Sequence, residues 1–381
     1  MNYKLFDKRA ICALRQLQNA GYGSWFVGGC VRDFIIGKKI NDYDLATIST
    51  PEVIIKIFKN YEIDQNALSY GCVRINYQDL WLEITTLRED IQQNGRHSQV
   101  IFTTDLSKDA QRRDFTINAL YWNGEKNSPI IDFSNGQSDL YSKNVCFIGS
   151  AEIRVQEDYL RILRFFRFSA IYGSSLNKDS FNACIKHQQG LAYLSGNRVW
   201  YEWSKTLLNA NTAGVLKYIC EYGIDITLFG GLLNLKASTN YQGNDPLLYT
   251  NLLLPTVHIK HLTHRLNLTK AQDMWLEVAE SIIFEQDFRK LYLKYGEAAK
   301  ELVYFWAAKF STSAKTEFSK PFWQVLEPIF PLTGKDLLKL GCLPGTIVGS
   351  YLKNTQNWWV QNNFVPNYKE CLEYANSLFK Q

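Results

Sequence analysis

Residues 24–47 read SWFVGGCVRDFIIGKKINDYDLAT, and this stretch decides the expected fold. Residues 24–27 are a short, mainly apolar strand candidate, and residues 42–46 form a second one that carries Asp42 and Asp44. Side chains two residues apart on a strand point to the same face, so both carboxylates can share one metal site. Neighbouring carboxylates repel each other unless a cation neutralises them, and such oxygen ligands suit Mg²⁺. The stretch therefore predicts a magnesium site on a small sheet.

The segment between these strands adds phosphate-binding chemistry. Gly28 and Gly29 allow the backbone to approach a phosphate closely, and Arg32 can bind phosphate oxygens in a bidentate fork. A glycine pair or a D-x-D pair alone is common in ordinary turns and exposed strands. Their occurrence together and in this order favours a nucleotide site for phosphoryl transfer.

A second cluster, RRDFTINAL, covers residues 112–120. Arg112 and Arg113 can place fixed cations beside a triphosphate, and Asp114 could accept a hydrogen bond from a ribose hydroxyl. Asn118 belongs to the same stretch and is also a candidate nucleotide-binding residue. The alternative interpretation is a solvated charged patch that ends in a buried strand or helix.

A third cluster, EDYLRILRFFR, covers residues 157–167. If this segment is helical, Asp158, Arg161, Arg164 and Arg167 recur every three residues and form one polar stripe. An ordinary salt bridge on a surface helix is the alternative. An aspartate and an arginine one turn apart can, however, also read the edge of a base.

Asp158 and Arg161 could recognise a base by its arrangement of hydrogen-bond donors and acceptors. The carboxylate accepts from an exocyclic amine, and the guanidinium donates to the neighbouring ring nitrogen. Cytosine and adenine both present this amine and acceptor, whereas guanine and uracil present an oxygen beside a ring N–H. The wrong bases would leave buried polar groups unpaired, so the pair predicts selection of C and A.

The remaining pattern predicts an α+β protein. Residues 1–20 suggest an amphipathic helix, Thr50 and Pro51 open another, and residues 71–76 and 80–86 are further strand candidates. Helical periodicity begins near Ala151 and continues to the end. We therefore expect an N-terminal head with a small mixed sheet and helices, followed by an all-α region.

Composition excludes several classes of protein. With 46% hydrophobic and 14% aromatic residues, the chain is not disordered, and its net charge of +5 permits polyanion binding without requiring it. The eight cysteines are scattered and include no C-x-x-C pair, which argues against a zinc ribbon or a redox dithiol. We find neither an 18-residue apolar run nor a signal peptide, and expect a cytoplasmic protein without a membrane partner.

Five motifs between residues 24 and 208 resemble, in order, those of the class II tRNA nucleotidyltransferase and bacterial poly(A) polymerase family. They are GGCVRD with DYD, LEITTLRED, RRDFTINAL, EDYLRILRFFRF and SGNRVWYEWSKTLL. The C-terminal stretch that begins PLTGKDLLKLGCLPG is similar to the tail of bacterial CCA-adding members. Residues 211–330 are recognisable only as helical.

The resemblance implies four regions: a catalytic head (1–149), a nucleotide-selecting neck (150–210), an RNA-binding body (211–330) and a tRNA-binding tail (331–381). It implies that Asp42 and Asp44 bind two Mg²⁺ ions and that Glu83 is a third, weaker carboxylate candidate. ATP and CTP would be substrates, and the acceptor arm and 3′ end of tRNA the partner. Triphosphate and base would contact Gly28, Gly29, Arg32, Arg112, Arg113, Asp114, Asn118, Asp158, Arg161, Arg164 and Arg167.

Alternatives within the family remain open. The polar span between Arg88 and Arg112 suits a mobile loop of full length, which in this family accompanies A addition. This favours CCA addition, with an A-adding specialist and a bacterial poly(A) polymerase as rivals. An inactive RNA-binding homologue would be expected to have lost the Asp42/Asp44 pair. The oligomeric state is not readable from the sequence.

Three histidines, His258, His261 and His264, are spaced by three residues. Such spacing can bind a metal on a helix. No adjacent His-Asp pair accompanies them, so we favour an ordinary helix surface.

Overall fold

The computed structural model describes residues 5–94, 97–209, 211–238, 243–254, 257, 259–281, 288–296, 298–310 and 329–379. The chain divides into two compact units. The first comprises Met1–Leu233 and Thr256–Thr269, and the second comprises Asn234–Pro255 and Lys270–Gln381. The four regions expected from the sequence stay a prediction.

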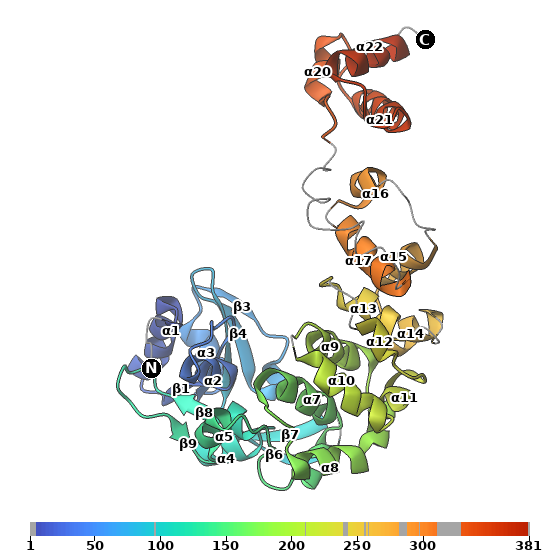
Figure 1. The fold of residues 1–381 in the computed structure, drawn as a ribbon. Helices are drawn as coiled ribbons and strands as arrows, with labels where there is room; N and C mark the ends of the chain where they lie inside the picture. Colours follow the sequence, from blue (N-terminus) through green and yellow to red (C-terminus); the bar gives the residue numbers. More distant parts are fainter. Residues whose placement is uncertain are drawn as a thin grey trace. The chain divides into compact units, whose positions relative to one another are not determined.

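The first unit is built on a seven-stranded sheet with the order β3-β4-β5-β2-β1-β8-β9. Strands β3, β4, β1, β8 and β9 of this sheet are labelled in Figure 1. The central pair β2 and β5 is parallel and the other neighbours are antiparallel, so the sheet is mixed. This confirms the predicted α+β class. The strands are β1 (Ser24–Val27), β2 (Tyr43–Thr47), β3 (Glu62–Asp64), β4 (Cys72–Asn76), β5 (Trp81–Thr86), β8 (Leu120–Trp122) and β9 (Ile131–Asp132).

Helices α1 (Lys8–Asn19) and α3 (Pro51–Ile57) contact one another and neighbouring strands of this sheet. The Asp7 side chain caps α1 by accepting a 2.8 Å hydrogen bond from the Arg9 backbone amide. Pro51 occupies the first turn of α3, where its missing N–H costs nothing, as expected from Thr50-Pro51. Burial alternates along β5: Leu82 and Ile84 are in the core, whereas Trp81 and Glu83 are exposed.

The span expected to be a mobile loop has regular secondary structure for most of its described length. It contains β6 (Arg88–Asn94) and β7 (His97–Phe102), which pair antiparallel in a separate two-stranded sheet, and then α4 (Leu106–Gln111). The loop prediction is therefore wrong for residues 88–94, 97–102 and 106–111. The sequence at residues 100–102, Val-Ile-Phe, is rich in strand-forming residues, and backbone pairing outweighs the polar character of the segment.

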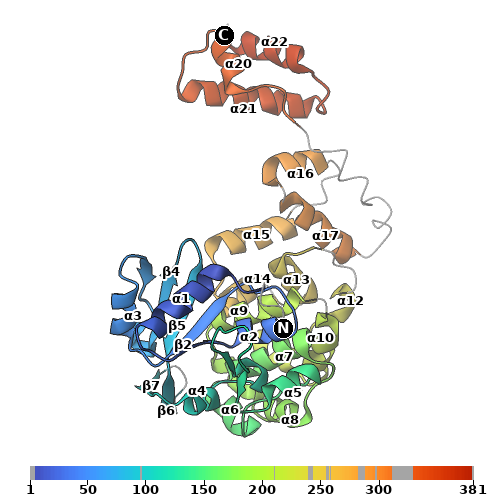
Figure 2. The same ribbon diagram turned by 90° about the vertical axis from the view of Figure 1, so that its left-hand side faces the viewer.

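Helices follow from Ala151 onward, as predicted. The head before Ala151 also contains short helices, with 3-10 helices labelled η: α2 (Gly29–Ile35), η2 (Leu68–Tyr70), η3 (Thr116–Asn118) and α5 (Gly136–Tyr141). In the first unit they are α6 (Ala151–Glu157), α7 (Leu160–Tyr172), α8 (Lys178–Lys186), η4 (Gln188–Tyr193), α9 (Gly196–Leu207), α10 (Thr212–Glu221), α11 (Ile224–Phe229) and α14 (Ile259–Leu266). Helices α7 and α9 pack together, and Figure 2 shows them beside the head. Their core includes Phe165, Phe166 and Trp203.

The expected single helix through Asp158 is interrupted. Asp158 is extended (φ −154°, ψ 107°) between α6 and α7. Its carboxylate accepts a 3.1 Å hydrogen bond from the Leu160 backbone amide, which satisfies a donor that a continuous helix would have paired internally. Asp158 is therefore placed just outside the helix that carries Arg161, Arg164 and Arg167.

The second unit is helical wherever it is described. It contains α12 (Leu235–Ser238), α13 (Pro246–Leu253), α15 (Lys270–Ser281), α16 (Phe288–Tyr295), α17 (Ala298–Phe310), α20 (Gly334–Lys339), α21 (Thr346–Gln361) and α22 (Tyr368–Phe379). The last three helices enclose a small core with Leu337, Trp359 and Cys371. Among the helices of the described ranges, none has the length and apolar character needed to cross a membrane.

Candidate active site

A cavity of about 560 Å³ lies in the first unit, lined by residues from the sheet, α2, η3 and α7. It brings together almost every residue that the sequence predicted for the site, although they are spread over 140 positions of the chain. Glu83 does not line the cavity. The predicted residues that line it are Gly28, Gly29, Arg32, Asp42, Asp44, Arg112, Arg113, Asp114, Asn118, Asp158, Arg161, Arg164 and Arg167.

The carboxylates gather at the start of the central parallel strand pair. Asp42 immediately precedes β2, Asp44 lies within it, and Glu83 of β5 is the direct register partner of Asp44. Burial, followed by the negative charge of Glu83, raises the pKa of Asp44 to about 6, against the opposing effect of Arg113. Asp42, Asp44 and Glu83 lie so close together that ionisation of all three is unfavourable unless a cation binds beside them.

This donor set fits Mg²⁺. Within the described ranges, no three His, Cys, Asp or Glu side chains form a group that could hold a metal ion by themselves. Mg²⁺ needs no such preformed cage, because it commonly binds one or two carboxylates and completes its shell with water and substrate phosphates. Asp42 and Asp44 are thus the residues that would hold it.

Gly28 forms a tight backbone turn at the cavity wall. Its backbone (φ 74°, ψ −129°) is in a region open essentially to glycine, and its N–H donates to the Leu120 carbonyl at 3.2 Å. A Cβ atom here would lie 3.8 Å from an Arg113 guanidinium nitrogen and 3.9 Å from a carboxylate oxygen of Asp44. The turn therefore brings backbone, cation and carboxylate together.

Arg32 is fixed in a buried position beside this turn. It donates to the Asn118 side-chain oxygen at 2.5 Å and to the Asp33 carboxylate at 3.0 Å. The centre of the Tyr172 ring lies 4.1 Å from the Arg32 guanidinium carbon, and the Tyr172 hydroxyl donates to the Asp33 carboxylate at 2.9 Å. Sequence reasoning missed Tyr172, which is 139 residues from Asp33 and looked like an ordinary aromatic residue of a helix.

Asp109 organises the second arginine pair and was also missed. Its carboxylate, only 1% exposed, accepts from Arg112 at 2.9 Å, from Arg113 at 3.0 Å and from the Tyr121 hydroxyl at 2.7 Å. Burial by itself would raise the pKa of Asp109, but Arg113 and Arg112 together lower it well below the ordinary value. The sequence contained a signal for these ion pairs, because Asp109 precedes Arg112 by three residues and Arg113 by four, the spacings at which helical side chains meet.

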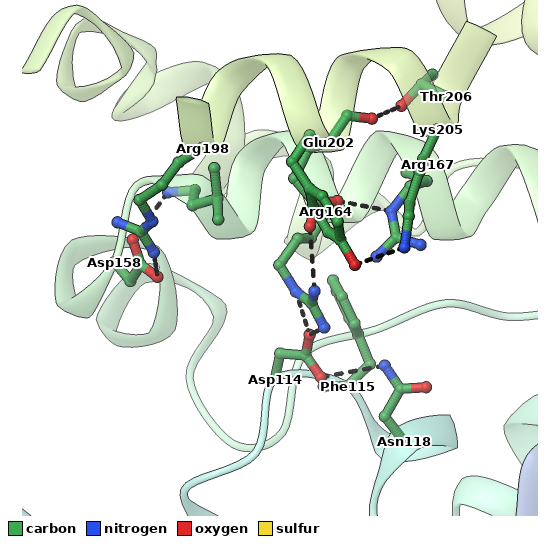
Figure 3. A network of polar contacts seen from close by, with 12 residues as sticks. Asp114, Phe115, Asn118, Asp158, Arg164, Arg167, Arg198, Glu202, Lys205 and Thr206 are labelled. Carbon is green, nitrogen blue, oxygen red and sulfur yellow. Dashed lines mark hydrogen bonds and ion pairs between the residues drawn. The ribbon is translucent and has the colours of Figure 1, made fainter. Parts of the chain in front are cut away.

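A network of polar contacts joins α7 to the head and to α9 (Figure 3). Arg164 donates to Asp114 at 2.7 Å and to Glu202 of α9 at 3.2 Å, while Arg167 donates to the other Glu202 oxygen at 2.6 Å. Asn118 donates to the second Asp114 oxygen at 3.1 Å and so links this network to Arg32. The predicted contact of Asp114 with a ribose hydroxyl stays a prediction.

Asp158 and Arg161 both line the cavity, but each has a different partner. Arg198 of α9 donates to Asp158 at 2.7 Å, as Figure 3 shows. Arg161 donates to the Glu157 carboxylate at 2.5 Å and to the Arg154 carbonyl at 2.9 Å. These contacts hold the carboxylate and the guanidinium at the cavity wall.

The histidine-rich segment stands apart from this site. His261 and His264 lie in α14 and are exposed, whereas His258 lies outside the described residues. Neither of the two described histidines lines the cavity.

Comparison with known proteins places these features in a family. The family described as "Poly A polymerase head domain" matches residues 24–146. The chain is also 30% identical over 384 residues to human CCA tRNA nucleotidyltransferase 1, mitochondrial, with 91% of this chain and 85% of the human protein covered. The chain belongs to the class II CCA tRNA nucleotidyltransferase and poly(A) polymerase family. This confirms the resemblance inferred from the five motifs.

Structures of family members agree with the described fold. The Bacillus stearothermophilus CCA-adding enzyme in complex with CTP is similar with a TM-score of 0.70 and 25% identity, and the similarity covers 98% of this chain and 97% of that one. The Thermotoga maritima CCA-adding enzyme complexed with tRNA has a TM-score of 0.60 at 17% identity, with 97% of this chain and 94% of that one covered. The second similarity concerns the fold alone.

Proposed function

We propose that this protein is a CCA tRNA nucleotidyltransferase, which adds C, C and A to the tRNA 3′ end from CTP and ATP without a nucleic-acid template. One observation carries the proposal: a single cavity, in a chain of this family, contains both Asp42/Asp44 and Asp158/Arg161. The first pair suits phosphoryl transfer and the second suits base selection. The enzyme would therefore choose the nucleotide and transfer it within one site.

In this mechanism, Asp42 and Asp44 would hold two Mg²⁺ ions, and Glu83 would be the additional carboxylate next to Asp44. Bound Mg²⁺ supplies charge stabilisation to the attacking hydroxyl and to the leaving oxygens. Arg32 and Arg113, both beside the Gly28 turn, bind the triphosphate. The RNA 3′-hydroxyl attacks the α-phosphorus in line, a new phosphodiester forms, and pyrophosphate leaves.

Base selection would use the free hydrogen-bonding capacity of Asp158 and Arg161. A carboxylate has about four lone-pair sites, so Asp158 can accept from an exocyclic amine while Arg198 remains bound. Arg161 has five N–H donors and can reach a ring nitrogen while Glu157 holds it. Guanine and uracil present the opposite polarity and would leave both groups unpaired.

Substitution of Arg161 by alanine is expected to relax this selection. The ratio of CTP and ATP incorporation to GTP and UTP incorporation should fall about 10- to 100-fold, since one good base contact is worth ~1–3 kcal/mol. The measurement is kcat/KM for each nucleotide on one RNA. Arg154→Ala is the matched control, because Arg154 also pairs with Glu157 but does not line the cavity. An unchanged ratio in Arg161→Ala would remove the base-reading role.

Three RNA transcripts test the activity against its alternatives. They end at the discriminator base, after one C, or after CC, and each is incubated with Mg²⁺ and one nucleotide at a time. CCA addition predicts C on the first two transcripts and A on the third only. Incorporation of A on the third transcript, without C on the others, indicates an A-adding specialist. A long A ladder on any RNA indicates poly(A) polymerase, and no incorporation indicates an inactive RNA-binding homologue.

The cytoplasmic location and the tRNA-binding role of residues 211–381 remain part of the proposal. The human relative described above is mitochondrial by name, so its location gives no support for the cytoplasm.

A further inference from the structure

One face of the main sheet carries a row of charged side chains that begins at Asp44 and crosses β5, β4 and β3. Asp44 of β2 is opposite Glu83 of β5, Glu83 is opposite Arg74 of β4, and Arg74 is opposite Asp64 of β3. Residues in direct register point to the same face, so these four side chains share one surface. This surface runs from the carboxylate site toward the β3 edge.

An exposed aromatic residue lies in the same surface. Trp81 is 40% exposed, and it shares its face with Glu83 because the two are separated by two positions on β5. The Arg74 guanidinium carbon lies 5.2 Å from the centre of the Trp81 ring, and its side chain is 50% exposed. An exposed tryptophan beside an exposed arginine is a typical platform for an unpaired nucleotide.

Sheet order places this platform across the carboxylates from the cavity. The cavity takes Gly28 from just after β1 and Asn118 from just before β8. Its arginines come from α2, from α7, from the residues after α4 and, as Arg88, from the start of β6. β1 and β8 lie on one side of β2, whereas β5 and β4 lie on the other. In-line transfer requires the attacking hydroxyl and the leaving pyrophosphate on opposite sides of the α-phosphorus. With the triphosphate in the cavity, the attacking RNA would approach over β5 and β4.

We propose that Trp81 and Arg74 bind the single-stranded 3′ end of the RNA substrate, with a base stacked on Trp81 and a backbone phosphate paired with Arg74. The inference rests on the proposed function, because it assigns the path of the attacking RNA. Trp81 and Glu83 are about 7 Å apart along the strand, a distance that one nucleotide spans.

Charge on the face limits the size of this site. The Asp64 carboxylate lies 3.9 Å from Arg74, longer than a hydrogen bond, so this exposed pair is weak and leaves guanidinium donors for a phosphate. Asp64 and Glu62 make the β3 edge acidic. The site therefore accommodates the last one or two nucleotides and not a longer strand.

Kinetics with Trp81→Ala separate RNA binding from nucleotide binding. We expect the KM for a transcript ending at the discriminator base to rise about tenfold, as for loss of one stacked base, while the KM for CTP changes less than about twofold. Trp81→Phe, which keeps a stacking ring, should restore most of the RNA affinity. Tyr141→Ala is the control, because Tyr141 is 66% exposed in α5, which follows the opposite edge strand β9.

An abasic nucleotide tests the stacking partner directly. Two RNA substrates are compared, one without the base of the terminal nucleotide and one without the base of the preceding nucleotide. With the wild-type enzyme, one of the two should show a KM raised about tenfold. With Trp81→Ala, neither missing base should raise the KM further. Arg74→Gln should reduce the slope of log KM against log salt by about 0.7.

Equal sensitivity of wild type and Trp81→Ala to the abasic sites, or a parallel rise in the KM for CTP, would overturn the assignment. Failure of the wild type to add any nucleotide would instead overturn the proposed function, so the two outcomes are distinguishable.

Discussion

Asp42→Ala is expected to reduce nucleotide transfer at least about a thousandfold, because it removes a carboxylate from the site that stabilises charge in the transition state. Asp42 precedes β2 and is exposed, so its loss leaves the core intact. The fold, measured by circular dichroism, and RNA binding, measured by titration, should stay near wild type. The rate is measured in single-turnover experiments with saturating Mg²⁺.

Asp179→Ala provides the control for removal of an acidic side chain. Asp179 is exposed in α8 and does not line the cavity, so its loss should change the rate little. A near-normal rate for Asp42→Ala would remove the metal assignment. Equal losses in both variants would show that the effect is general and not specific to the site.

Asp109→Asn has the largest expected effect on stability. The substitution leaves Arg112 and Arg113 without their shared countercharge, and breaking a buried ion pair typically costs about 3–5 kcal/mol. The free energy of unfolding should fall by that amount in denaturant titrations. Because the two arginines also line the cavity, the KM for nucleotides should rise in the fraction that remains folded.

The pH dependence of this effect has a defined sign. The pKa of Asp109 is lowered in the folded protein, so its ionised form stabilises the fold above the unfolded pKa of about 3.9. The stability difference between wild type and Asp109→Asn should be constant from about pH 5 to 8, and it should shrink as the pH falls below about 4. A difference that grows on acidification, or one no larger than for Asp179→Asn, would contradict the ion-pair role.

Local sequence signals predicted much of the head. β1 was expected at its observed bounds, the start of α3 followed from Thr50 and Pro51, and the D-x-D pair lies at β2 as its spacing indicated. These features depend on residues within a few positions of one another. The cavity residues were predictable for the same reason, since each motif contributes its side chains as a short contiguous set.

Long-range partners could not be predicted in this way. Glu202 binds Arg164 and Arg167 from 38 and 35 residues away, and Arg198 binds Asp158 from 40 residues away. Their pairing depends on the packing of α9 against α7, which no local pattern specifies. The break at Asp158 was missed because the three-residue spacing of charges suggested a continuous helix, whereas a side-chain cap of Leu160 outweighs that pattern.

The most direct test of CCA addition supplies all four nucleotides and Mg²⁺ to a tRNA transcript that ends at the discriminator base, and then sequences the products at their 3′ ends. We expect the enzyme to add C, C and A in this order and then to stop, so that G and U are absent from the products. Products with mixed bases, or with a run of A directly on the discriminator base, would contradict it.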